Sequence, residues 1–400
     1  MNNKEIVENK IIELLLDEDN ITRPFLNEYF DIRPATLLEI IDGLKNKGII
    51  AEPERKGKKT GRKASPVCLN EEYAYIVGLD FQINSTSGIV MDLRKNVKAR
   101  FEIQSSKGKD IKSGREEIRK VIENLKQQLG DTWGRVKGIG FADPGLVNTE
   151  KGLSIKAVNI PGWNSLNTSQ WLEENFGLDS IIYPSSMVRT YIEYQNTYPN
   201  YPKSLFHMEL SSGIGGGFIK DGNLFTGDSY CGMEIGHIVV DPNGPLCQCG
   251  NKGCLEAVAG KSGIWKKVME LISNGVQTEL NMENFSIPFF IKCVKDRDKA
   301  ACGLAHDICN NIGLGLASVV ALLNPSVIVF SGELSALDEF LVSVVKRTIS
   351  LHCFPLAVEA LDIRVSKCDQ YANALGGALL MRKKILLAST NSSKSPGTAG

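Results

Sequence analysis

The stretch EIGHIVVDPNGPLCQCGNKGCLE, residues 234–256, holds one of the four histidines of the chain and three of its ten cysteines. A glutamate stands at each end, Glu234 and Glu256, and His237 precedes the cysteines Cys247, Cys249 and Cys254. The other cysteines are scattered, as small buried thiols commonly are. A histidine and three cysteines this close together are therefore a specific feature, and its role has to be inferred from the rest of the chain.

The composition is that of a soluble globular protein. A chain of 400 residues exceeds one simple core, so we expect two or three folding units. Lys+Arg and Asp+Glu both number 46, so any face for nucleic acid has to be local. No signal peptide and no apolar run of ~20 residues is recognisable. Cysteines without a secretory signal favour a cytoplasmic protein with reduced thiols and no membrane partner.

Residues 1–70 have the pattern of a winged helix-turn-helix. Apolar residues recur at helical spacing over residues 4–16, Thr22 is suited to cap a second helix, and Pro34 is suited to begin a third. Two short strands then flank the turn GKKTG. In such a module the third helix lies in the major groove of DNA.

The charge of this module is concentrated in the expected wing. Residues 55–63 carry six positive charges and no negative one, which suits contact with phosphates or the minor groove. The third helix offers Leu38, Glu39 and Asp42, a poor set for base edges. We therefore predict DNA contacts from Arg33, Thr36, Lys58, Lys59, Arg62 and Lys63. The alternative is a solvated charge run on a helical protein-interaction module.

The rest of the chain, residues 71–386, alternates strands, helices and glycine-rich turns. The segments GIGFADPGLVN (138–148) and LSSGIGGGFI (210–219) each combine strand residues with a glycine turn where a ligand can approach the backbone. This pattern, repeated across two halves, predicts an α/β protein of two lobes with a cleft.

These segments, with AVNIPGW (157–163) and above all EIGH followed by CQCGNKGCLE, resemble the ROK family of repressors, open reading frames and kinases. The resemblance covers about residues 10–385. It implies an actin-like, ribonuclease-H-like ATPase fold of the sugar-kinase type. Lobe one would be about 71–180 plus the C-terminal helix, and lobe two about 181–370. Residues 387–400 look like a disordered tail, and a homodimer or homotetramer is expected.

The resemblance also gives residues 234–256 a role. His237, Cys247, Cys249 and Cys254 suit a closed tetrahedral Zn²⁺ site, which would be structural because no position is left for water. A disulfide and unliganded thiols are the alternatives. In related proteins the matching Glu, His and Glu bind sugar hydroxyls, which implies ligand contacts by Glu234, His237 and Glu256, with Gly145 and Asn159 at further sugar positions. Two solvated acids on a loop are the plainer interpretation.

Two features of ROK kinases are missing. Gln82 and Ile83 follow Asp80 where kinases carry paired glycines, and the Asn-Asp pair that holds the general base falls on Pro184 and Ser185. The turn SGE (331–333) also lacks the kinase glycines on the adenosine side. Losing the base and the phosphate cradle removes several orders of magnitude in rate, since each contributes ~10²-fold or more. We therefore expect no enzyme activity and no bound ATP.

The sequence thus predicts a DNA-binding transcriptional regulator, a repressor of carbohydrate metabolism genes, which senses a sugar or sugar derivative. Its partners would be operator DNA with two half-sites, the effector and further copies of the chain. Two alternatives stay open. One is an active or residual ATP-dependent sugar kinase. The other is a ligand-independent DNA-binding scaffold, because Pro184 and Ser185 also remove two usual sugar contacts.

Overall fold

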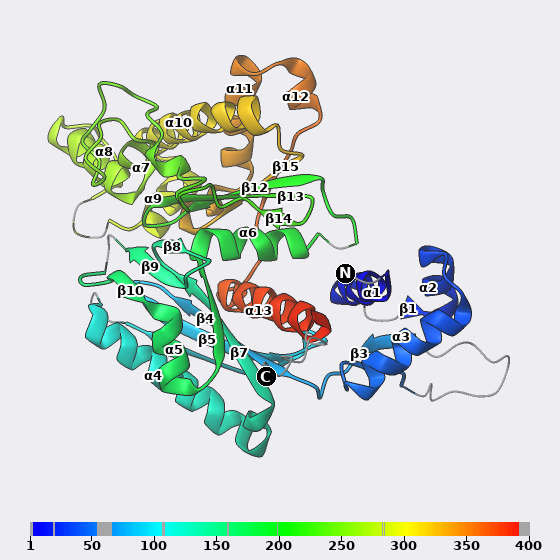
Figure 1. Cartoon of the computed structure of the whole chain (residues 1–400). Helices are drawn as coiled ribbons and strands as arrows, with labels where there is room; N and C mark the ends of the chain where they lie inside the picture. Colours follow the sequence, from blue (N-terminus) through cyan, green and yellow to red (C-terminus); the bar gives the residue numbers. More distant parts are fainter. Residues whose placement is uncertain are drawn as a thin grey trace. The chain divides into compact units, whose positions relative to one another are not determined.

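A computed structural model describes residues 3–18, 21–53, 66–105, 109–157, 160–197, 199–281, 283 and 285–391. The chain forms two compact units, one made of Met1–Val188 with Gln370–Gly400 and the other of Arg189–Asp369. Figure 1 shows the elements of each unit. The wing tip, with Lys58, Lys59, Arg62 and Lys63, lies outside the described residues, and so does Asn159.

The N-terminal module has the predicted order of elements. Its helices are α1 (Asn3–Asp17), α2 (Arg23–Phe30) and α3 (Pro34–Asn46), and its strands are β1 (Ile21–Thr22), β2 (Ile50–Ala51) and β3 (Pro66–Leu69). The Thr22 side chain accepts a hydrogen bond from the Phe25 amide and caps α2, while Pro34 opens α3. The strands form an antiparallel sheet in the order β1-β3-β2. Helices followed by a β2–β3 hairpin are the arrangement of a winged helix-turn-helix.

Each unit contains a five-stranded sheet, and the two sheets repeat one topology. The first has the order β11-β7-β4-β5-β6 and the second the order β14-β13-β12-β15-β16. In both, the first three strands of the chain pair antiparallel, and the fourth and fifth join parallel. This duplication confirms the expected ribonuclease-H-like fold. The strands are β4 (Tyr75–Phe81), β5 (Ser85–Asp92), β6 (Val97–Gln104), β7 (Val136–Asp143), β11 (Asp179–Pro184), β12 (Ser204–Leu210), β13 (Ile214–Lys220), β14 (Asn223–Leu224), β15 (Val327–Ser331) and β16 (Asp362–Val365).

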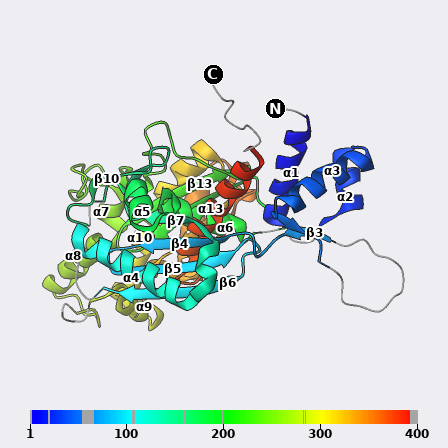
Figure 2. The ribbon, with the colours of Figure 1, turned by 60° about the horizontal axis from the view of Figure 1, so that its bottom comes forward.

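The first sheet is covered by α4 (Ile111–Leu129) on one face and by α13 (Ala372–Asn391) on the other (Figures 1 and 2). The packing of α13 is unusually close because glycines face it. A Cβ on Gly78 would lie 1.8 Å from the Ala374 carbonyl oxygen, and a Cβ on Gly140 would lie 1.9 Å from that of Gly377. The helix extends to Asn391, so residues 387–391 of the expected tail are helical, and residues 392–400 lie outside the described part.

The N-terminal helix α1 packs against α13 within the same unit. Arg382 of α13 is buried, at 2 % exposure, and its guanidinium donates to the carbonyl oxygen of Leu16 at 2.5 Å. Leu16 lies in the last turn of α1, where a positive side chain complements the exposed carbonyl end of the helix. The N-terminal module is thereby attached to the C-terminal helix by a specific contact.

The core of the second unit is built around α10 (Lys299–Leu323). Among the described residues α10 is the one helix long and apolar enough to cross a bilayer, and half of its most apolar window is buried. It packs against α7 (Leu255–Ala259), α9 (Ile287–Lys295) and α11 (Glu339–His352). This packing accounts for its apolar residues, because a central core helix has the same length and composition.

Smaller elements complete the two units. They are β8 (Leu146–Asn148), β9 (Leu153–Lys156), β10 (Asn164–Asn167), α5 (Thr168–Phe176), α6 (Ser185–Gln195), α8 (Lys261–Ser273), α12 (Pro355–Glu359) and the 3₁₀ helices Gly130–Arg135, Ile235–His237 and Glu333–Leu337. Strands β8, β9 and β10 form an antiparallel sheet in the order β10-β9-β8, directly after β7 in the chain.

Candidate metal and effector site

The loop of residues 234–256 is closed on itself by backbone pairing. Antiparallel bridges join Val239 to Cys254 and Leu246 to Lys252. Gly253 has a φ of +70°, and a Cβ there would lie 1.6 Å from the Asp241 carbonyl oxygen. Only glycine fits this close approach, which returns the chain to Cys254.

The loop brings the four predicted ligands together. One ligand atom from each of His237, Cys247, Cys249 and Cys254 lies within 4.8 Å of the others. The His237 Nδ1 to Cys247 Sγ distance is 3.7 Å, and the Cys249 Sγ to Cys254 Sγ distance is 3.6 Å. Thiolates on a tetrahedral metal with ~2.3 Å bonds are about 3.8 Å apart. The donor set and its spacing therefore fit a four-coordinate metal ion.

The three thiols differ in their surroundings. Cys247 and Cys254 are buried and Cys249 is exposed. Burial raises the pKa of the Cys247 thiol, and it raises the pKa of Cys254 to about 12. The backbone N–H of Asn251 lowers the pKa of Cys249. A metal ion holds such ligands as thiolates, so its binding would displace protons from the buried pair.

The two flanking glutamates lie beside this cluster. His237 Nε2, the ring nitrogen away from the cysteines, lies 3.9 Å from Glu234 Oε2. Glu256 accepts a hydrogen bond from the Ile214 amide at 2.9 Å, and a Cβ on Gly213 would lie 2.4 Å from the same carboxylate oxygen. Burial raises the pKa of Glu234; His237 opposes this rise and Glu256 adds to it. Two carboxylates and an imidazole edge are thus brought together by the loop of residues 234–256.

Gly145 lies in the other unit, between β7 and β8. A Cβ there would lie 2.2 Å from the Lys156 carbonyl oxygen, so the turn needs glycine. The Gly145 amide donates to Asp143 Oδ1 at 2.8 Å. The structure therefore groups Glu234, His237 and Glu256 in one unit and places Gly145 in the other.

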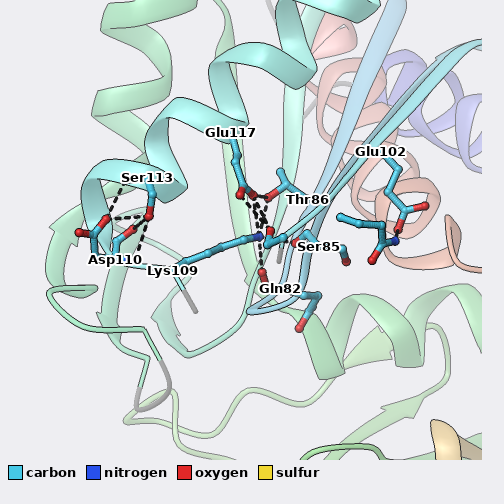
Figure 3. Close-up of polar contacts among 10 residues, drawn as sticks. Gln82, Ser85, Thr86, Glu102, Lys109, Asp110, Ser113 and Glu117 are labelled. Carbon is cyan, nitrogen blue, oxygen red and sulfur yellow. Dashed lines mark hydrogen bonds and ion pairs between the residues drawn. The ribbon is translucent and has the colours of Figure 1, made fainter. Parts of the chain in front are cut away.

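The turn between β4 and β5, where a kinase would hold phosphates, is filled by a lysine of the chain itself (Figure 3). Lys109 Nζ donates to the carbonyl oxygens of Gln82 (2.5 Å) and Ser85 (2.6 Å) and to Thr86 Oγ1 (2.7 Å). It also forms an ion pair with Glu117 at 2.9 Å. Burial lowers the pKa of Lys109, and the hydrogen bond to Glu117 opposes the shift. No sequence pattern predicted this contact, because most of the acceptors are backbone or hydroxyl oxygens, which belong to no motif.

The position expected for a general base is neutral. Pro184 ends β11, and Ser185 begins α6. The acid closest in register is Asp143, which pairs with Pro184 across the neighbouring strand β7. Its carboxylate is fully buried and accepts hydrogen bonds from Ser154 and Trp163. It is therefore enclosed by the protein and closed to solvent.

In the N-terminal module, Arg33 is exposed at the start of α3 and Thr36 is half-buried one turn on. The two acids of this helix are paired with cations of neighbouring helices. Lys4 lies 3.3 Å from Glu39, and Arg23 lies 3.9 Å from Asp42. These pairs partly offset the negative charge of α3.

Comparison with known proteins identifies the family. The sequence pattern of the ROK family matches residues 76–384. The chain belongs to the ROK family. It is 23% identical to the xylose repressor of Caldicellulosiruptor bescii over 379 residues, covering 93% of this chain and 94% of that protein. It is also 23% identical to the DNA-binding transcriptional dual regulator NagC of Escherichia coli K12, over 92% of this chain and 89% of that one.

ROK kinases match a shorter part of the protein. The glucokinase of Halalkalibacterium halodurans is 27% identical over 253 residues, which is 62% of this chain and 76% of that enzyme. Among solved structures, a ROK family transcriptional regulator described as a homologue of E. coli MLC superposes with a TM-score of 0.84 at 23% identity. It covers 97% of this chain and 98% of that one. This chain thus shares the fold of that regulator along nearly its whole length.

Proposed function

We propose that this protein is a cytoplasmic transcriptional regulator that represses carbohydrate metabolism genes and senses a sugar or sugar derivative through an inactive kinase domain. The observation that carries the proposal is the N-terminal module of three helices and a hairpin, joined to the ROK domain. Relatives named as repressors align across both parts, whereas the matched glucokinase covers 62% of the chain.

The DNA side rests on the winged helix. Arg33 and Thr36 at the start of α3 would meet base edges, and Lys58, Lys59, Arg62 and Lys63 of the wing would meet phosphates. A homodimer or homotetramer would place two such modules on an operator with two half-sites. Glu39 and Asp42 are already paired with cations of the module. The exposed start of α3 would therefore be the part of this helix that faces DNA.

The sensor side rests on the residues around the metal loop. Glu234, His237 and Glu256 would exchange hydrogen bonds with sugar hydroxyls, and Gly145 and Asn159 are the further expected sugar contacts. His237 Nδ1, Cys247, Cys249 and Cys254 would hold a structural Zn²⁺, which supplies rigidity to the loop and leaves no position for a reacting water. The effector must bind the DNA-competent and released states with different affinity to act as a switch.

Catalysis is not part of the proposal. Lys109 occupies the phosphate turn with its own hydrogen bonds, Ser185 stands where the base is expected, and Asp143 is enclosed. We expect an ADP-release assay with glucose, D-xylose and N-acetylglucosamine to give no turnover above background. Turnover that a Ser185→Ala variant abolishes would favour a residual kinase instead.

The direct test is binding to the DNA upstream of the gene, measured by fluorescence anisotropy at two salt concentrations. The sugars would be D-xylose, N-acetylglucosamine, glucose and their 6-phosphates or 5-phosphates. We expect specific, salt-sensitive binding that one sugar weakens. Specific binding that none of these sugars alters would favour a ligand-independent scaffold, and absence of specific binding would remove the regulator proposal.

A further inference from the structure

Asp143 is the last residue of β7, and its carboxylate is fully buried. Three donors from separate places in the chain reach it. The Gly145 amide donates to Oδ1 at 2.8 Å, and Ser154 Oγ (2.5 Å) and Trp163 Nε1 (2.9 Å) donate to Oδ2. Ser154 Oγ also lies 2.6 Å from Thr168 Oγ1, at the start of α5. One carboxylate therefore joins β7 to three later segments.

These donors frame the small sheet that follows β7. Gly145 directly precedes β8, Ser154 lies in β9, and Trp163 directly precedes β10. The Trp163 carbonyl accepts from the Ala157 amide at 2.9 Å, and its amide donates to Ile160 at 3.1 Å. Fixing the Trp163 side chain consequently fixes the 160–163 turn and its pairing with Ala157. The Gly145 turn is the sugar-facing element proposed for this part of the unit.

Burying the Asp143 carboxyl costs free energy of folding, so stability alone does not explain this geometry. Among the described residues no ion pair involves Asp143, and its three hydrogen-bond donors are all neutral groups. Burial raises the pKa of Asp143, against the three hydrogen bonds. An interior carboxylate without a cation costs more than an apolar residue of similar volume. What Asp143 provides that an apolar residue would not is acceptance of three hydrogen bonds from separate segments.

We propose that Asp143 is the positioning residue of the effector site. Its carboxylate holds the Gly145 turn and the 160–163 turn in a fixed relative geometry, so that the Gly145 turn presents its backbone to a sugar. The role as an effector site rests on the proposed function, whereas the positioning of the two turns does not.

The variants Asp143→Asn and Trp163→Phe test this. The amide of asparagine offers one acceptor and turns an N–H toward a donor, while phenylalanine keeps the ring and removes the indole N–H. The matched control is Asp92→Asn. Asp92 is also fully buried in the same sheet, and it is held by the Arg94 and Asn96 amides, the Asn96 side chain and Lys98.

Deuterium exchange by mass spectrometry gives the first readout. We expect both test variants to speed exchange at least about tenfold at Gly145, Ala157 and Trp163, because an opened turn exposes these amides. Asp92→Asn should change only its own turn. Should Asp143→Asn fail to fold, Trp163→Phe and Ser154→Ala carry the same test. Unchanged exchange in residues 144–163 of the folded variants would overturn the proposal.

Calorimetric titration with D-xylose, N-acetylglucosamine and glucose gives the second readout. A sugar that binds the wild type should bind Asp143→Asn at least about tenfold more weakly, with sugar-free operator affinity changed less than about twofold. Equal sugar affinity in the two proteins would overturn the effector role. If none of these sugars binds the wild type, the proposed sensor function fails for them, and the exchange result still decides the positioning.

Discussion

At the scale of single residues, Cys249 is the exposed member of the metal cluster and Cys231 an exposed cysteine outside it. We expect Cys249→Ser to lose most of its bound zinc, from about one ion per chain, and to lower the melting temperature, because binding and folding of such loops are coupled. Cys231→Ser should keep its zinc. Metal analysis by mass spectrometry with parallel thermal melts checks this, and stoichiometric zinc in Cys249→Ser would contradict the ligand assignment.

Lys109 offers a second test at this scale. Replacing it with methionine keeps the length of the side chain but leaves Glu117 and two carbonyl oxygens without their buried partner. We expect a loss of about 3 kcal/mol in the free energy of unfolding, measured with urea. The exposed neighbour Lys112 is the control, and its methionine variant should stay within about 0.5 kcal/mol. An equal effect of the two changes would mean that the turn does not depend on Lys109.

Residues whose partners are close in sequence were predictable, and those with distant partners were not. The four metal ligands lie within eighteen consecutive residues, 237–254, so their spacing and softness point to one site. Asp143 and Lys109 are ordinary residues in the sequence, and their partners are mainly backbone and hydroxyl groups up to 27 positions away. Their roles follow only from the folded backbone.

At the scale of elements, Glu52 connects three parts of the winged helix. It receives Arg23 Nε at 2.6 Å from α2 and Lys45 Nζ at 3.0 Å from α3, and it directly follows β2. The hydrogen bond from Arg23 is the main reason that the pKa of Glu52 is lowered. The sequence predicted these helices and strands by their apolar spacing, but this polar junction had no periodic pattern to reveal it.

The lowered pKa predicts a pH dependence. The unfolded pKa of a glutamate is about 4.3. A carboxyl whose pKa is lower in the folded chain stabilises the fold above that unfolded pKa, and this stabilisation is lost as the pH falls through the folded pKa. We expect Glu52→Gln to be about 1–2 kcal/mol less stable at pH 7 and to show a shallower acid decline below about pH 4.5. The control is Glu39→Gln, because Glu39 is exposed and pairs with Lys4 in the same module. Denaturant unfolding from pH 3 to pH 7 measures both, and parallel acid limbs for Glu52→Gln and wild type would refute the assignment.

At the scale of the whole molecule, the duplicated sheet was expected from the family resemblance and could not have come from periodicity. Parallel neighbours such as β4 and β7 are about sixty residues apart in the chain, and nothing local to either strand specifies the pairing. The close approach of α13 to Gly78 and Gly140 is similarly long-range. Sequence patterns predicted individual helices and strands, whereas their pairing and packing followed only from the family resemblance or from the structure.

Arg382 gives the prediction at this scale, because its contact with Leu16 joins α13 to the N-terminal module. We expect Arg382→Met to stay folded and keep its zinc but to bind operator DNA about tenfold more weakly, since the loss of one buried charged hydrogen bond loosens α1. Lys384→Met, on the same helix with an exposed ion pair to Asp179, is the control. Anisotropy titrations measure both, and unchanged affinity in Arg382→Met would show that α1 does not need this anchor.

The place of α13 at the end of the chain has a consequence for synthesis. The first unit begins at the N-terminus, yet the helix that fills its glycine-lined face leaves the ribosome only after the whole of Arg189–Asp369. At ~5–20 residues per second that interval lasts roughly 10–40 s. During this interval the second unit, which is contiguous in the chain, is free to fold. The helix α1 and the first sheet still lack α13, against which both pack. A nascent chain that has not yet reached Gln370 therefore carries α1 without the helix whose Arg382 anchors it.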